Sequence, residues 1–390
     1  MTRREYMNQL EEALAACDSE LRNEILADYA EHFKNGILAG KSEEEVCTEL
    51  GDISEFISEL PPEYNVLPAN ITALTTTEAH SQSDGANTGF MLPITQYTAG
   101  IDTVIIESGA TSNSSANIHI IKSDDNNINI EGPSFEISGY KCSVDIENTA
   151  CHIKITQAKP VSANVLQRIF RQYQATYTIY IPDCITKLSA ASHCGDIDIN
   201  NCNIATITFT NHSGDIEINN CNFDNLHANT SNGDIEASVA QARTAHLSTS
   251  NGDIDIDHFN AESLHAQTSN GDIDLANITA EKLLARSSNG DVDVAGSFNE
   301  ITAASSRGDV DVISFNNCPS VDIKSSMGDV NYECKHCTGF VANCKTSMGD
   351  CDVSFHGQDL TKGSDKRYYA GDESAQISIS TSMGDICLTC

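Results

Sequence analysis

The sequence of 390 residues contains no tryptophan, and its 22 Lys and Arg residues are outnumbered by 56 Asp and Glu. A formal net charge of −34 argues against nucleic acid and against an anionic membrane as partners, because the overall field of the protein would repel both. Any membrane contact is therefore expected to be peripheral at most. The natural partners are a protein or cationic peptide, and Ca²⁺ is the one cofactor that this composition suggests.

Long apolar runs are also missing. No stretch of eighteen apolar residues occurs, so no transmembrane helix is expected. The first residues, MTRREYMNQLEEALAACDSEL, carry charges throughout and lack the apolar segment of a secretory signal. The odd number of cysteines, 15, fits a reducing compartment better than a disulfide framework. We therefore expect a cytoplasmic protein, with the cell surface, reached by a non-classical export route, as the alternative.

The sequence does contain a repeat. From residue 195 on, a motif that begins with Gly-Asp, as a rule followed by Ile or Val, recurs at ten positions, and the first six glycines are spaced 19 residues apart. These glycines are Gly195, Gly214, Gly233, Gly252, Gly271, Gly290, Gly308, Gly328, Gly349 and Gly384. A fixed period of this length is typical of a solenoid, in which each repeat packs only on its neighbours.

Each repeat predicts at least two strands. Counting from the glycine, apolar residues stand at +2 and +4, as in Ile254 and Ile256, and again at −7 and −5, as in Leu264 and Ala266 before Gly271. A period of two is that of a strand with one buried face. The predicted fold is mainly β: a right-handed parallel β-helix, or β-solenoid, with coils of about 19 residues.

Helical periodicity extends through the N-terminal region. Residues 1–62 predict a small all-α domain whose helices begin at the caps Thr2, Ser19 and Ser42, with a fourth helix over residues 53–60. Residues 63–95, rich in Thr, Ala, Ser, Asn and Gly, predict a flexible linker. The solenoid would then occupy residues 96–390, with regular repeats over 188–390. The segment 164–173, NVLQRIFRQY, is interpreted either as loop packing or as a basic amphipathic patch.

Two resemblances accompany this pattern. The segment EILADYAEHFKNGILAGKSEEEVCTELGDISEFISEL resembles the HAAS domain of Firmicute proteins, which implies a role in envelope or regulatory signalling. The entry strand YTIYIPDCITKLSAASHCGDIDI and the final TSMGDICL resemble a bacterial family of β-strand-repeat proteins named as candidate adhesins. That second resemblance covers about residues 96–390 and implies a β-solenoid with a role in surface attachment.

Acidic residues at +1 and +3 are the first candidate site. Both positions have the opposite parity to the buried pair, so they should form two outward columns of carboxylates. One interpretation is that the +1 aspartates cap turn N–H groups, and the other is a face that binds Ca²⁺ or a polycation. The candidate residues are Asp196, Asp215, Asp234, Asp253, Asp255, Asp272, Asp274, Asp291, Asp293, Asp309 and Asp311.

Histidines and cysteines form the second candidate site. His227, His246 and His265 all stand at −6 and should stack, either as a polar ladder or as ligands of a transition metal. Two C-x-x-C pairs, Cys334 with Cys337 and Cys387 with Cys390, are candidate zinc ligands, although their separation is not that of a zinc ribbon.

No nucleophile elbow, phosphate-binding loop or dinucleotide motif occurs, so no catalytic residue is assigned and the protein is expected not to be an enzyme. The function that the sequence favours is a binding scaffold in bacterial envelope-stress sensing or regulation, which presents acidic ladders to a partner. The alternatives are a surface or secreted adhesin and a carbohydrate-active β-helix enzyme.

Overall fold

The computed structural model describes residues 3–14, 42–50, 94–97, 100–109, 116–132, 140–157, 175–361 and 367–390, and individually Arg22, Leu26, Tyr29, Phe33 and Ile53. Apart from those five residues, the helices expected after Ser19 and over 53–60 lie outside the described residues, as do Thr2, most of the linker and the segment 164–173. Residues 94 and 95, included in the expected linker, belong instead to a strand.

Two of the expected helices are confirmed. Helix α1 spans Arg3–Ala13 and helix α3 spans Glu43–Leu50, directly after the predicted cap Ser42. Apolar residues of both helices pack with Leu14, Tyr29 and Phe33 in one buried cluster, to which the helices contribute Tyr6, Leu10, Val46, Cys47 and Leu50. The Glu43 carboxylate accepts a hydrogen bond of 3.0 Å from the backbone N–H of Arg3, at the start of α1, where a negative charge is favourable.

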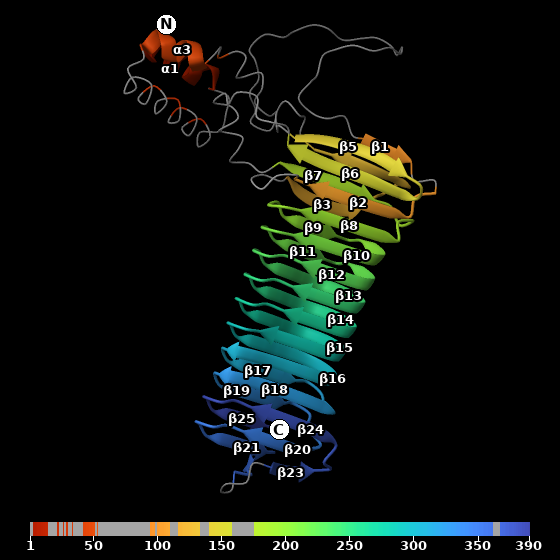
Figure 1. Cartoon of the computed structure of the whole chain (residues 1–390), viewed down its shortest axis with the longest axis vertical. Helices are drawn as coiled ribbons and strands as arrows, with labels where there is room; N and C mark the ends of the chain where they lie inside the picture. Colours follow the sequence, from red (N-terminus) through yellow and green to blue (C-terminus); the bar gives the residue numbers. More distant parts are fainter. Residues whose placement is uncertain are drawn as a thin grey trace. The chain divides into compact units, whose positions relative to one another are not determined.

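The rest of the described chain is a β-solenoid in which parallel strands of successive coils pair in register (Figure 1). The strands of its first part are β1 Ile94–Tyr97, β2 Thr103–Ser108, β3 Asn117–Lys122, β4 Asn127–Glu131, β5 Tyr140–Glu147, β6 Ala150–Gln157, β7 Thr176–Ile181, β8 Lys187–Ser192, β9 Ile197–Asn200, β10 Asn203–Asn211, β11 Ile216–Asn219 and β12 Asn222–Asn229.

The second part continues the stack. Its strands are β13 Ile235–Ser248, β14 Ile254–Gln267, β15 Ile273–Ser287, β16 Val292–Arg307, β17 Val310–Ser314, β18 Ser320–Met327, β19 Val330–Cys334, β20 Gly339–Lys345, β21 Cys351–Phe355, β22 Gln358–Asp359, β23 Arg367–Gly371, β24 Ala375–Ser380 and β25 Ile386–Thr389. In the middle coils the two strands expected per repeat run together as one long strand. A corner remains inside it at +6, where Val239, His258 and Asn277 have positive φ.

The chain does not follow the order of the coils at either end of the solenoid. Strand β2 pairs on one side with β6 and on the other with β8, so the first coil in the chain lies second in the stack. Likewise β25 lies between β19 and β21, and β24 between β18 and β20. The last segment of the sequence therefore fills a slot one coil inside the C-terminal end, as Figure 1 shows.

Antiparallel strands cover both ends of this stack. At one end β5 pairs with β6, and β4 pairs with β7. At the other end β23 pairs with β20, and β22 pairs with β21. An uncovered end coil would expose a row of unpaired N–H and C=O groups that could recruit further strands.

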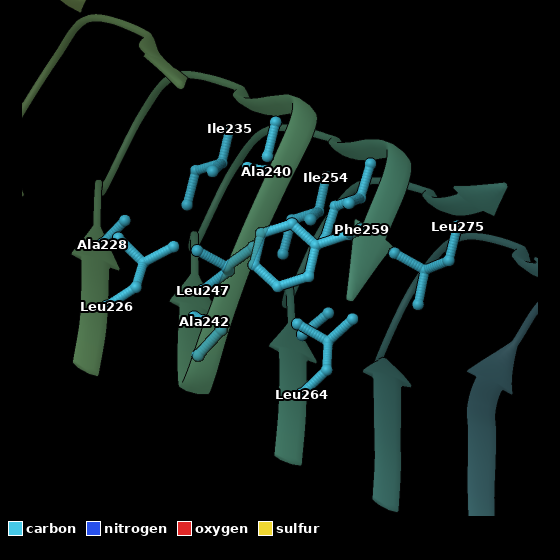
Figure 2. Close-up of a cluster of buried hydrophobic side chains, with 14 of the residues drawn as sticks. Leu226, Ala228, Ile235, Ala240, Ala242, Leu247, Ile254, Phe259, Leu264 and Leu275 are labelled. Atoms are coloured by element: carbon cyan, nitrogen blue, oxygen red, sulfur yellow. The ribbon is translucent and has the colours of Figure 1, made fainter. Parts of the chain in front are cut away.

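The two predicted inward rows form the core. Ile254 and Ile256 from the first row and Leu264 and Ala266 from the second are all at most 2% exposed, and Phe259 at the corner fills the space between them (Figure 2). Each residue stacks on its equivalent in the neighbouring coils, as Ile254 does on Ile235 and Ile273. The assignment of strand faces from the sequence is confirmed.

Candidate functional site

The +1 aspartates form a continuous chain of hydrogen bonds from coil to coil. The Oδ1 atom of each except the last in the stack accepts the backbone N–H of the +1 aspartate in the next coil, at 2.7–3.0 Å. We call this set the capping column: Asp196, Asp215, Asp234, Asp253, Asp272, Asp291, Asp309, Asp329, Asp385 and Asp350, in spatial order. The turn-capping interpretation of these side chains is confirmed, with the difference that each caps the adjacent coil.

The other polar residues of the motif also connect coils. Hydroxyl groups such as those of Thr249 and Thr268 donate to motif glycine carbonyls at 2.9 and 3.0 Å. The side-chain amides of Asn251 and Asn270 each donate to the asparagine oxygen one coil away, at 2.9 Å. Hydrogen bonds between coils thus explain most of the recurring Thr-Ser-Asn-Gly-Asp motif. The sequence alone did not predict these bonds for Thr and Asn.

The +3 acids form a second, separate column with no such backbone role. In-register pairing places seven carboxylates on seven consecutive coils. We call this set the acidic ladder: Asp198, Glu217, Glu236, Asp255, Asp274, Asp293 and Asp311. Its ends are His119, which pairs with Asp198, and Asn331, whose Nδ2 donates to Asp311 at 2.6 Å.

The ladder is shorter than the repeat suggests. Asp352 also stands at +3 and follows Asn331 in sequence, but Cys387 of the inserted strand β25 lies between them in the stack. The order of motifs along the chain therefore does not give the order of side chains along the column.

The pKa of several ladder carboxyls is raised. Burial, followed by repulsion from Glu217, raises the pKa of Asp198 from 3.8 to about 6. The pKa values of Glu236, Asp255 and Asp293 are raised in the same way, first by burial and then by the carboxylates of neighbouring coils. Carboxylates about 4.8 Å apart repel by about 1 kcal/mol in water and more where water is partly excluded. The ladder therefore holds unfavourable charge that a bound cation would relieve.

Replacing Asp198 with asparagine should stabilise the protein at pH 7. A carboxyl whose folded-state pKa is raised destabilises the fold above that pKa, and this loss disappears as the pH falls through the folded and then the unfolded value. We expect a gain of about 1 kcal/mol at pH 7, after allowance for solvent screening, which vanishes near pH 4. Thermal melting of D198N and the parent between pH 4 and 8 measures this. Asp224→Asn, at an exposed position on β12, is the control, and an equal, pH-independent gain in both variants would contradict the prediction.

The three histidines at −6 form an in-register column whose rings are tilted against one another rather than parallel. The ring centroids of His227 and His246 lie 6.1 Å apart, and those of His246 and His265 lie 5.1 Å apart. The Nδ1 atoms of His246 and His265 are 3.2 Å apart. Burial, and then the nearby His246, lower the pKa of His265. The predicted stack is confirmed, and Leu284 ends it on the side of the next coil.

Three of the four candidate zinc-ligand cysteines come together. The Sγ atoms of Cys334, Cys337 and Cys390 all lie within 4.8 Å of one another, the one such group of three or more among the residues described. We call this set the sulfur cluster. Its hydrogen bonds lower the pKa of Cys334 to about 3 and raise that of Cys337 to about 11. The structure does not bring Cys387 to this group: it is exposed and stands in the +3 column, pairing with Asn331.

None of the helices in the described part of the chain is long and apolar enough to span a lipid bilayer.

Comparison with solved structures finds similar proteins at low identity. A candidate adhesin of Bacteroides fragilis is 17% identical, with a TM-score of 0.39 and coverage of 62% of this chain and 96% of that chain. A candidate adhesin of Parabacteroides distasonis is 10% identical, with a TM-score of 0.38 and coverage of 76% and 96%. A candidate lipid-binding protein of the same species is 14% identical, with a TM-score of 0.35 and coverage of 76% and 98%.

Comparison with curated proteins gives no significant match. The family models do match. The HAAS model matches residues 5–59, which confirms the resemblance of the N-terminal region. The Toastrack DUF4097 model matches residues 110–296 and 275–389, which together span most of the sequence and nearly all of the solenoid. This chain therefore belongs to the Toastrack DUF4097 family.

Proposed function

We propose that this protein is a non-enzymatic binding scaffold whose acidic ladder binds a cationic segment of a partner protein. The observation that supports this proposal is the in-register column of seven carboxylates that lack the backbone partners of the capping column. The strand positions that pair with the ends of the column are His119 and Asn331, so neither end is closed by a Lys or Arg in register.

The dimensions of the ladder favour an extended peptide. Seven coils spaced about 4.8 Å apart span roughly 29 Å, which matches about nine residues of extended chain. Several Lys or Arg side chains could then contact the column together, and each would relieve repulsion between adjacent coils. Single Ca²⁺ ions are a weaker fit, because Ca²⁺ takes about six to eight oxygen ligands and the ladder presents its oxygens from one side.

Conversion of three ladder aspartates to asparagine tests this function. The variant D255N/D274N/D293N should bind a fluorescent oligolysine peptide at least tenfold more weakly than the parent, as measured by fluorescence anisotropy at fixed salt. It should also lose the rise in melting temperature that the peptide, and to a smaller extent millimolar Ca²⁺, gives the parent beyond that of NaCl at equal ionic strength.

The chain provides a matched control. D253N/D272N/D291N removes the same number of charges from the same coils, but from the capping column, where asparagine retains the Oδ1 acceptor. This variant should keep most of the peptide affinity. If both triple variants lose affinity equally, net charge rather than the ladder is responsible; if the parent shows no binding above the effect of salt, the proposed function is wrong.

We propose further that the scaffold acts in bacterial envelope regulation, with the HAAS region as the regulatory part. The support for this is the family match over residues 5–59 and its place ahead of the solenoid. Cell fractionation distinguishes it from an adhesin role, since a protease-accessible pool on the cell surface would favour the adhesin.

A further inference from the structure

The topology of the C-terminal end brings the sulfur cluster together from three segments. Cys334 ends β19, Cys337 follows three residues later in the turn before β20, and Cys390 follows directly after β25. Because β25 pairs with β19 up to Glu333 and Thr389, Cys334 and Cys390 are the next residues in register on adjacent coils. The cluster thus joins cysteines from sequence positions 56 residues apart.

Other neighbouring thiols of the described chain occur in pairs. The backbone N–H of Cys202 lies 3.4 Å from the Sγ of Cys221, in a column where both side chains are buried. Burial raises the pKa of these thiols, to about 12 for Cys202 and about 11 for Cys221, as expected of sulfur that fills apolar space. The sulfur cluster differs because three Sγ atoms point to one place.

We propose that Cys334, Cys337 and Cys390 bind one Zn²⁺ ion, which fastens the inserted last coil to strand β19. Zinc–sulfur bonds of about 2.3 Å in a tetrahedral site place the sulfur atoms about 3.8 Å apart. The three Sγ atoms, already within 4.8 Å of one another, need to approach by about 1 Å at most. Cys334 and Cys337 are 5% and 7% exposed, so the ion would be held mostly away from water. A water molecule or an external ligand would take the fourth position.

Bound zinc should stabilise the attachment of residues 375–390 to the rest of the solenoid. Residues 375–390 occupy their place through pairing with strands that precede them in the chain. A metal bridge from Cys390 to Cys334 and Cys337 would join this coil to the turn between β19 and β20. A metal ion that binds only the folded state stabilises that state by mass action, so zinc should raise the melting temperature of the C-terminal coils.

The test uses the full chain, reduced and stripped of metal, titrated with Zn²⁺ against a chromophoric chelator. The parent should bind one equivalent, and C337S and C390S should lose this binding by at least a hundredfold. C387S is the matched control: it removes an exposed thiol from the same strand and should bind like the parent. Co²⁺ should give thiolate-to-cobalt charge-transfer absorption in the parent and in C387S, and not in C390S.

Two outcomes of the titration overturn the proposal: a parent that does not compete with the chelator for zinc, or a C387S variant that loses binding as C390S does. Binding of Cu⁺ without Zn²⁺ also refutes it as stated. If a serine variant does not fold, alkylation of the parent decides. Zinc should then protect Cys334, Cys337 and Cys390, mapped by mass spectrometry, and protection of any other set contradicts the assignment.

Discussion

Replacing Ile254 and Ile256 together with aspartate is expected to unfold the middle of the solenoid. The two side chains are 0% and 2% exposed, and both lie between equivalent residues of the coils before and after. A buried carboxyl must either stay ionised in an apolar space or take up a proton, and each choice costs several kcal/mol. Since a coil is stable only through its neighbours, the loss should spread to both sides.

Circular dichroism and limited proteolysis measure this effect. The double variant should lose a large part of its β signal at 25 °C and become cleavable within residues 235–290. Asn260→Asp, at an exposed position of the same strand β14, is the control and should leave the melting curve nearly unchanged. Equal loss of structure in both variants would mean that the faces of the strand are assigned wrongly.

The period of the sequence predicts the contents of a coil well. Positions +2, +4, −7 and −5 are buried because an alternating pattern can bury only one face of a strand, and this holds whatever the order of the coils. The order itself is a property of the whole chain. Between Gly328 and Gly384 the spacing changes to 21 and then 35 residues. This irregularity marks the place where β20 leaves a gap next to β18, which β24 occupies later in the chain.

The candidate sites were predictable to different degrees. The alternation of side chains along a strand places the residues at +1 and +3 on the same outward side. It cannot show that the Oδ1 atom of the +1 aspartate accepts a hydrogen bond from the next coil, because that bond depends on how closely the turns approach. For the cysteines a usable signal was present. Cys334 and Cys390 both stand at +6 from their glycines, whereas Cys387 stands at +3, so repeat numbering would have separated the pair that meets from the residue that does not.

Replacing Gly271 with alanine should be as damaging as a charge in the core, although it adds a single methyl group. A Cβ atom on Gly271 would lie 2.0 Å from the carbonyl oxygen and 2.6 Å from the carbonyl carbon of Gly252, and 2.7 Å from Oδ1 of Asp253. Two of these three atoms belong to the backbone of the neighbouring coil, which cannot move without breaking the pairing of that coil. The φ of +153° adds strain for any residue with a side chain.

We expect a loss on the order of 3 kcal/mol or more in the stability of the central coils. Gly357→Ala separates the two causes, because Gly357 also has positive φ, +76°, yet its Cβ would meet nothing within 4 Å. That variant should lose only about 1 kcal/mol, the cost of the backbone conformation alone. Chemical denaturation of both variants gives the comparison. If Gly271→Ala costs no more than Gly357→Ala, then close packing of coil on coil is not the reason that glycine recurs in every motif, and the backbone conformation of the turn would have to explain it.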